Sequence, residues 1–124
     1  MNDKRPVNLD LTTIKFPVTA IASITHRMTG VAIFVAIPVL LWMLDRSLAS
    51  PESFADLKQL MTSPLAKLVL LAILAAIFYH LVAGIRHLIM DAGMAETLEG
   101  GRRGAFATFI VTVVLILLAG AWVW

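Results

Sequence analysis

The three histidines of this chain limit the chemistry that it can perform. His80 lies within residues 68–85, an apolar run that carries no formally charged residue. An imidazole in hydrocarbon is costly without a partner, so an ionisable side chain at such a depth indicates a functional site. Gly84 and His87 follow one and two helical turns later, on the same predicted stripe. A deep imidazole beside a glycine gap predicts an iron ligand for a flat cofactor such as haem.

A second polar cluster, SITHRMTG at residues 23–30, interrupts the first apolar region. On a helix, Ser23, Arg27 and Gly30 share a stripe, and His26 lies beside it. We expect this cluster and His87 to meet at one end of the membrane segments. The deep imidazole would then lie beneath cations and hydroxyls that can hold haem propionates and hydrogen-bond a quinone carbonyl.

Each of these residues also has a simpler explanation. Arg27 can anchor its helix by extending to the interface, and Ser23 can bond to its own helix backbone. A cation such as His87 at a helix end favours the helix dipole. His80 itself can serve as a hydrogen-bonded packing residue or as a proton relay.

The composition places most of the chain in a lipid bilayer. Of its 124 residues, 60% are hydrophobic, and the mean hydropathy is +0.89. A soluble domain is about half apolar, so the surplus must face lipid. There is no cysteine, and any iron–sulfur chemistry would therefore belong to a partner. The cations do not cluster away from the apolar runs, which argues against nucleic-acid binding.

Three apolar runs predict an all-α membrane protein with spans at about 20–45, 64–89 and 104–124, within one membrane-anchor domain over residues 1–124. Pro17 and the pair Ser63-Pro64 suit helix starts. Ser50-Pro51 predicts a short helix between the first two spans, lying along the interface. A removable leader is disfavoured, because acidic residues precede residue 30 and two further spans follow.

The positive charges predict the orientation of the spans. The side of the N-terminal tail and second loop carries seven cations, against three on the side of the first loop and C-terminus. The first set is Lys4, Arg5, Lys15, Arg27, Arg86, Arg102 and Arg103; the second is Arg46, Lys58 and Lys67. This bias predicts a cytoplasmic N-terminus and a C-terminus on the outer side.

The histidine count predicts an incomplete site. Only His80 lies deep, so a haem with two histidine ligands needs a second chain or a second copy. Three helices also cannot enclose a haem well. We therefore expect this chain to be one part of a multi-subunit helical bundle.

The ordered set RPVNLDL at residues 5–11, SITHRMTG at 23–30 and YHLVAGIRH at 79–87 resembles the cytochrome b556 membrane-anchor subunits of bacterial succinate dehydrogenase. The resemblance covers essentially the whole chain and is closest to ubiquinone-reducing enzymes. It departs at Thr25, where relatives often carry an apolar residue. The resemblance implies a multi-pass protein of the bacterial inner membrane, with a periplasmic C-terminus. Its implied partners are a second small membrane-anchor subunit, an iron–sulfur subunit and a flavoprotein subunit.

The resemblance also implies roles for individual residues. His80 matches the axial ligand of haem b iron, and the sister membrane subunit would supply the other histidine. Ser23 and Arg27 match the ubiquinone pocket. His26 and Arg27 match residues near the haem propionates, and His87 matches a histidine on the cytoplasmic side. The implied function is electron transfer from succinate oxidation to ubiquinone, in respiration and the tricarboxylic acid cycle.

Three alternatives remain open at this point. A fumarate reductase anchor of similar build would run the chemistry in the opposite direction. A structural anchor or assembly factor would hold no cofactor. A small multidrug transporter would use His80 as a proton relay, but such transporters usually place a carboxylate within a span, and the apolar runs 30–44, 68–85 and 105–124 have none.

Overall fold

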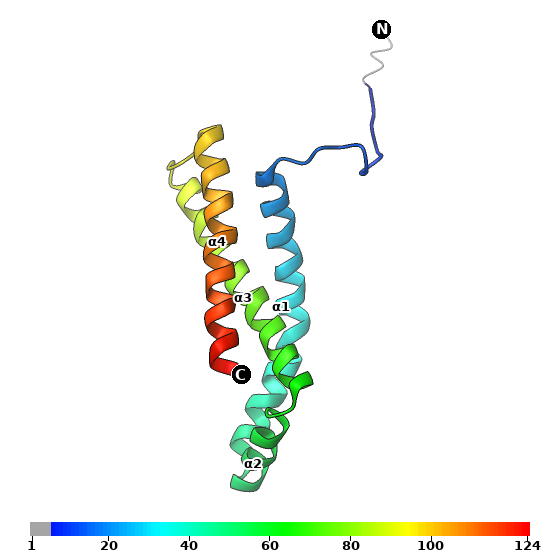
Figure 1. Ribbon diagram of the computed structural model, residues 1–124, viewed down its shortest axis with the longest axis vertical. Coiled ribbons are helices and arrows are strands. Elements are labelled where there is room, and N and C mark those ends of the chain that lie inside the picture. Colours follow the sequence, from blue (N-terminus) through cyan, green and yellow to red (C-terminus); the bar gives the residue numbers. More distant parts are fainter. Residues whose placement is uncertain (1–5) are drawn as a thin grey trace.

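The computed structural model describes residues 6–124, which form four helices (Figure 1). These are α1 (Val18–Ala49), α2 (Pro51–Leu60), α3 (Pro64–Asp91) and α4 (Leu98–Val123). α1, α3 and α4 are long and apolar enough to cross a membrane. The predicted all-α class with three membrane helices is confirmed. Lys4 and Arg5, which contribute to the predicted charge bias, lie outside the described residues.

Side-chain caps fix where three of the helices begin. The Ser50 hydroxyl accepts a hydrogen bond from the Ser53 N–H, and Pro51 follows at the first helical position. The Ser63 hydroxyl accepts from the Ala66 N–H in the same way, with Pro64 next. These bonds satisfy backbone donors that have no partner within the helix. The predicted short helix after Ser50 and the predicted helix start at Ser63 are both confirmed.

α4 begins earlier than the span expected from residue 104. Thr97 caps the helix by accepting from the Gly100 N–H, so the glycine–arginine segment 100–104 is helical. A methyl group at Gly100 would lie 2.9 Å from the Ala95 carbonyl oxygen, and glycine avoids that clash. The Thr97 cap starts the helix here despite the low helix propensity of glycine.

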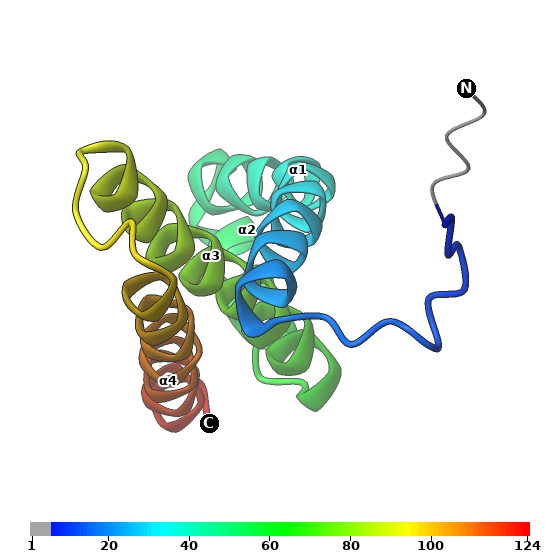
Figure 2. The same cartoon turned by 90° about the horizontal axis from the view of Figure 1, so that it is seen from above.

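The three long helices pack through small side chains. α3 contacts both α1 and α4 (Figures 1 and 2). Ala22 of α1, Ala83 of α3 and Ala105 of α4 are buried at these contacts. The one large buried side chain among residues 6–124 is Tyr79, whose hydroxyl donates to the Ala22 carbonyl at 2.9 Å. Small residues let membrane helices approach closely, which matters because no hydrophobic effect drives helix association within lipid. Tyr79 therefore has a packing role between α1 and α3.

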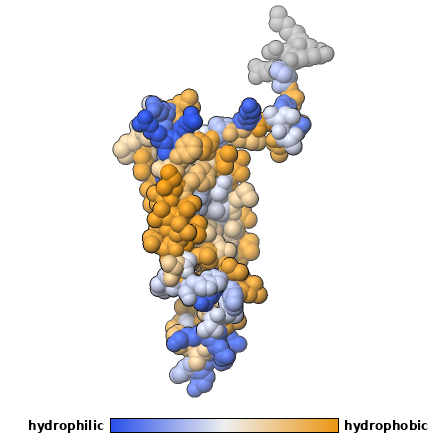
Figure 3. Space-filling view, viewed as in Figure 1, coloured by the Kyte–Doolittle hydropathy of each residue, from blue (hydrophilic) through white to orange (hydrophobic). Residues whose placement is uncertain are grey.

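A broad apolar band covers the outside of the helices between two hydrophilic ends (Figure 3). Large side chains such as Phe34, Val35 and Leu117 are more than 60% exposed within this band. In contrast, six apolar residues of the described chain are buried: Ala22, Ala36, Tyr79, Ala83, Ala105 and Ala119. The chain therefore covers little of its own apolar surface, and lipid or partner helices must cover the rest.

The segment before α1 contains a polar turn at residues 8–13. The Asn8 side chain bonds to the Asp10 N–H and the Thr13 hydroxyl, and the Asp10 carboxylate accepts from the hydroxyl and N–H of Thr12. The two Thr12 bonds hold the pKa of Asp10 below its ordinary value. The turn leaves the intervening Leu9 and Leu11 at least 70% exposed.

Candidate functional site

All three histidines meet between α1 and α3. The ring of His26 stacks on that of His80, with centroids 4.1 Å apart and planes at 24°. The centroid of the His87 ring lies 5.1 Å from the centroid of the His26 ring. We call His26, His80 and His87 the histidine column. The two polar clusters of the sequence therefore converge, as their positions near the same helix ends predict.

Hydrogen bonds to α1 fix the ring of His80. Its Nδ1 lies 3.1 Å from the carbonyl oxygen of His26 and 3.3 Å from the hydroxyl of Thr29. A carbonyl only accepts, and the Thr29 hydroxyl already donates its hydrogen to the same carbonyl at 2.9 Å. Nδ1 must therefore carry the hydrogen in these bonds. The lone pair of the neutral ring is then on Nε2, the arrangement common to metal-ligating histidines.

Two glycines make room for the column. A methyl group at Gly30 would lie 3.1 Å from Cε1 of His80, closer than side chains normally approach. One at Gly84 would lie 3.7 Å from Nε2 of His26. The glycine gap on the His80 helix was expected to admit a flat cofactor, but the structure places the His26 ring there. α1 packs against α3 at this height, and the imidazole fills the space.

His26 retains an unused polar atom. Its Nε2 is buried and has no hydrogen-bond partner among the described residues. A buried polar atom without a partner costs about 1–3 kcal/mol, so native proteins rarely leave one. This atom therefore calls for a group that the isolated chain does not supply.

Ser23 and Arg27 lie four residues apart on α1, beside the column. Arg27 is exposed and Ser23 is half-buried. Within residues 6–124 the hydroxyl of Ser23 forms no hydrogen bond, whereas Thr25 bonds back to the Ile21 carbonyl. The alternative in which Ser23 bonds to its own helix is therefore not observed, and both groups are free for an external partner.

Arg86 does not join the histidine column, although it precedes His87 directly. Its Nη2 donates to the Gly101 carbonyl of α4 at 3.1 Å, and Gly104 leaves space for its side chain. On the sequence, Asp91 can pair with Arg86, Arg102 or Arg103. Among the described residues, the observed ion pair instead joins Arg103 to Glu99, one turn earlier on α4.

The donor set fits a haem shared with another chain. Within residues 6–124, no three His, Cys, Asp or Glu side chains are arranged to hold a metal ion by themselves. An iron at His80 would need its remaining ligands from a porphyrin and from a second protein. The anchored Nδ1 of His80 and the unpartnered Nε2 of His26 suit an iron ligand and a polar contact to such a group.

Sequence reasoning did not assign a role to Thr29 or to the gap at Gly30. Both follow His26 by three or four residues, and so share its helix face. Once His26 is placed toward α3, that spacing puts Thr29 and Gly30 opposite His80. The spacing of the motif contains this information, but it can be used only once the face of α1 that packs against α3 is known.

Known proteins resemble the chain over its whole length. Residues 1–119 match the family described as succinate dehydrogenase/fumarate reductase transmembrane subunit. The succinate dehydrogenase cytochrome b556 subunit of Coxiella burnetii is 47% identical, with 100% of both chains covered. That of Paracoccus denitrificans is 35% identical over 92% of this chain and 88% of its own. The cytochrome b560 subunit of Reclinomonas americana is 36% identical, over 80% and 72%.

These matches agree with the three membrane-length helices and with the ordered motifs that the helices carry. The chain belongs to the family of succinate dehydrogenase cytochrome b556 subunits, which are multi-pass membrane anchors.

Proposed function

We propose that this chain supplies one axial ligand of haem b and part of the ubiquinone-reduction site of a succinate dehydrogenase. One observation carries the proposal: Nδ1 of His80 is anchored to the His26 carbonyl, which leaves Nε2 with the lone pair that iron requires. The name cytochrome b556, which the relatives carry, supports a b-type haem. A histidine of the second small membrane subunit completes the ligand set.

The other residues of the site hold and orient the bound groups. His26 lies beside His80, and with Arg27 it would hold the haem propionates, which would give Nε2 of His26 the partner that it lacks. His87 lies next to His26 on the same side of the site. When bound, haem b accepts and releases single electrons. Ser23 donates its hydroxyl hydrogen to a quinone carbonyl. The Arg27 guanidinium stabilises the negative charge that develops on the quinone oxygen during reduction, because a fixed charge acts strongly in a low-dielectric site.

The proposed assembly places the chain in a bacterial inner membrane beside three partners. A flavoprotein subunit oxidises succinate, an iron–sulfur subunit passes the electrons on, and the sister subunit completes the membrane anchor. The cytoplasmic N-terminus follows from the distribution of cations, which puts the histidine column near the iron–sulfur subunit. The succinate dehydrogenase names of the three relatives above favour this direction over fumarate reduction.

A difference spectrum tests the proposal. We expect membranes that contain this chain and its sister subunit to show a b-type α-band in a dithionite-reduced minus oxidised spectrum. Either subunit alone should give no such band, because each provides one ligand. A fully assembled complex without the band would overturn haem binding and favour a cofactor-free anchor.

A tight contact predicts the effect of a methyl group at Gly30. Gly30→Ala pushes on Cε1 of His80, and overpacking of this kind typically costs about 1–3 kcal/mol. We therefore expect the affinity for haem to fall about tenfold. The measurement is the haem-to-protein ratio of the purified complex. Gly120→Ala is the matched control, because a methyl group there meets no atom within 4 Å. Equal ratios in the two variants would contradict the prediction.

A further inference from the structure

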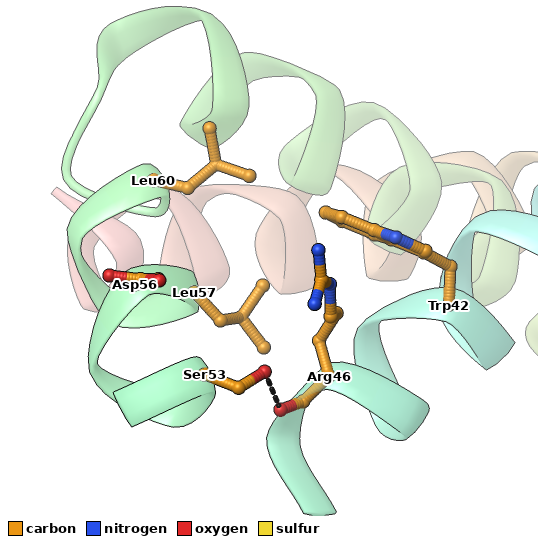
Figure 4. Close-up of a pocket in the computed structure, with 6 residues that line it drawn as sticks. All are labelled: Trp42, Arg46, Ser53, Asp56, Leu57 and Leu60. Atoms are coloured by element: carbon orange, nitrogen blue, oxygen red, sulfur yellow. Dashed lines mark hydrogen bonds between the residues drawn. The ribbon is translucent and has the colours of Figure 1, made fainter. Parts of the chain in front are cut away.

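A second site lies at the opposite end of α1 from the histidine column. Arg46 follows His26 by 20 residues, about 30 Å along the helix. There the end of α1 and the short helix α2 enclose a pocket of about 120 Å³ (Figure 4). Its lining residues are Trp42, Arg46, Ser53, Asp56, Leu57 and Leu60.

The pocket presents one cation and one anion without pairing them. Figure 4 shows the Arg46 side chain reaching past Leu57 toward the Trp42 ring, with Asp56 on the α2 side. The Ser53 hydroxyl fixes this corner by donating to the Arg46 carbonyl at 2.7 Å. Among the described residues, no ion pair joins Arg46 to Asp56. The other cations nearby are engaged elsewhere: Lys58 lies over the Phe54 ring and Lys67 over the Trp124 ring.

An apolar groove continues from this pocket toward the middle of the membrane. Trp42 and Leu60 also line a cavity of about 270 Å³ between α1 and α3. Val69 and Ile73 of that cavity in turn line a third, of about 230 Å³, which extends to Ala32. Neighbouring cavities share lining residues, so the three follow one another from the α1–α2 corner along the face between α1 and α3 and outline one path.

The length and chemistry of this path match those of a phospholipid. From Trp42 to Ala32 the groove runs about 15 Å, which is half of a hydrocarbon core of roughly 30 Å. One acyl chain of one leaflet spans that depth. A tryptophan at the boundary is typical of the membrane interface. The polar end offers a guanidinium for a phosphate and a carboxylate for an ammonium group.

We propose that this groove binds a zwitterionic phospholipid whose headgroup carries a phosphate and an ammonium group, as in phosphatidylethanolamine. Arg46 binds the phosphate, Asp56 binds the ammonium, and one acyl chain lies between α1 and α3. An anionic lipid without an amine would face repulsion from Asp56. A quinone would leave the carboxylate of Asp56 without a partner. The site is separate from the proposed haem and ubiquinone site and does not depend on it.

Photolabelling of the complete complex tests the proposal. The complex is reconstituted with phosphatidylethanolamine that carries a diazirine in one acyl chain, and labelled peptides are mapped by mass spectrometry. We expect labels in residues 32–42 of α1 and 65–73 of α3. A parallel sample uses phosphatidylglycerol with the same chains, which keeps the phosphate and removes the ammonium.

Two variants separate the headgroup contacts. Arg46→Gln should lower labelling by both lipids about tenfold, because a charge-assisted contact to the phosphate is lost. Asp56→Asn should lower phosphatidylethanolamine labelling about threefold and raise that by phosphatidylglycerol. Lys58→Gln is the control, since Lys58 does not line the pocket. If the labelling of the groove is unchanged in both variants, the headgroup assignment is overturned. If the groove carries no label in the assembled complex, a partner helix covers it, and the proposal that it binds a lipid is overturned.

Discussion

His80→Leu is expected to abolish the b-type spectrum of the assembled complex while leaving its membrane helices in place. Leucine keeps much of the apolar volume of the ring but offers no lone pair to iron. The hydrogen bonds lost with the imidazole are those of Nδ1 to the His26 carbonyl and the Thr29 hydroxyl. The carbonyl keeps the Thr29 hydroxyl as a donor, so the fold loses little.

The measurement is a reduced minus oxidised spectrum, normalised to the amount of complex from a gel of all subunits. Tyr79→Phe serves as the control, because it removes the buried hydrogen bond from the neighbouring Tyr79 to the Ala22 carbonyl of α1 without removing the proposed ligand. A normal bis-histidine spectrum in His80→Leu would exclude His80 as the axial ligand. Loss of haem in both variants to the same extent would indicate a general loss of packing rather than of a ligand.

Arg27→Leu should impair ubiquinone reduction strongly and spare succinate oxidation by an artificial electron acceptor. Removing a group that stabilises developing negative charge typically costs about 100- to 1000-fold in rate. We expect a loss of that order in kcat/KM for ubiquinone. The acceptor assay should be unchanged, because it draws electrons before they reach the membrane site.

The exposure of Arg27 makes this variant informative, since no packed core depends on the side chain. Arg102→Leu is a matched control: it removes an exposed arginine at the same end of the bundle, where the guanidinium lies over the Phe106 ring. Equal quinone kinetics in Arg27→Leu and the wild type would contradict the proposed role. Equal losses in both variants would indicate a general effect of surface charge.

The sequence predicts most of this fold because its signals are local. Hydropathy alone locates the three long helices, and the serine–proline pairs at residues 50–51 and 63–64 mark helix starts. The sequence did not predict that α4 extends back to Leu98, because segment 100–104 combines glycines and arginines, which are typical of a loop. The Thr97 cap and the close approach of Gly100 to Ala95 are local contacts, but composition alone does not carry them.

The sequence predicts which residues gather at the candidate site, but not how their side chains contact one another. Depth along each helix correctly indicates that His26, His80 and His87 lie near one another. The stacking of His26 on His80 depends on how α1 is rotated about its axis, and periodicity in an almost uniformly apolar helix does not fix that rotation. The same rotation decides that Gly84 faces His26 and that Arg86 turns toward α4. Whether Ser23 and Arg27 bind a quinone stays a prediction.

The shallow packing between these helices has a consequence for how cells control the amount of this protein. A chain that buries little beyond alanines and one tyrosine gains little free energy by folding alone. Its persistence in the membrane then depends on the partners that cover its remaining surface. We therefore expect surplus copies to stay loosely packed and open to membrane proteases, so that the supply of the other subunits of the complex would set the level of this one. Such dependence would keep the subunits in equal numbers without matched rates of synthesis.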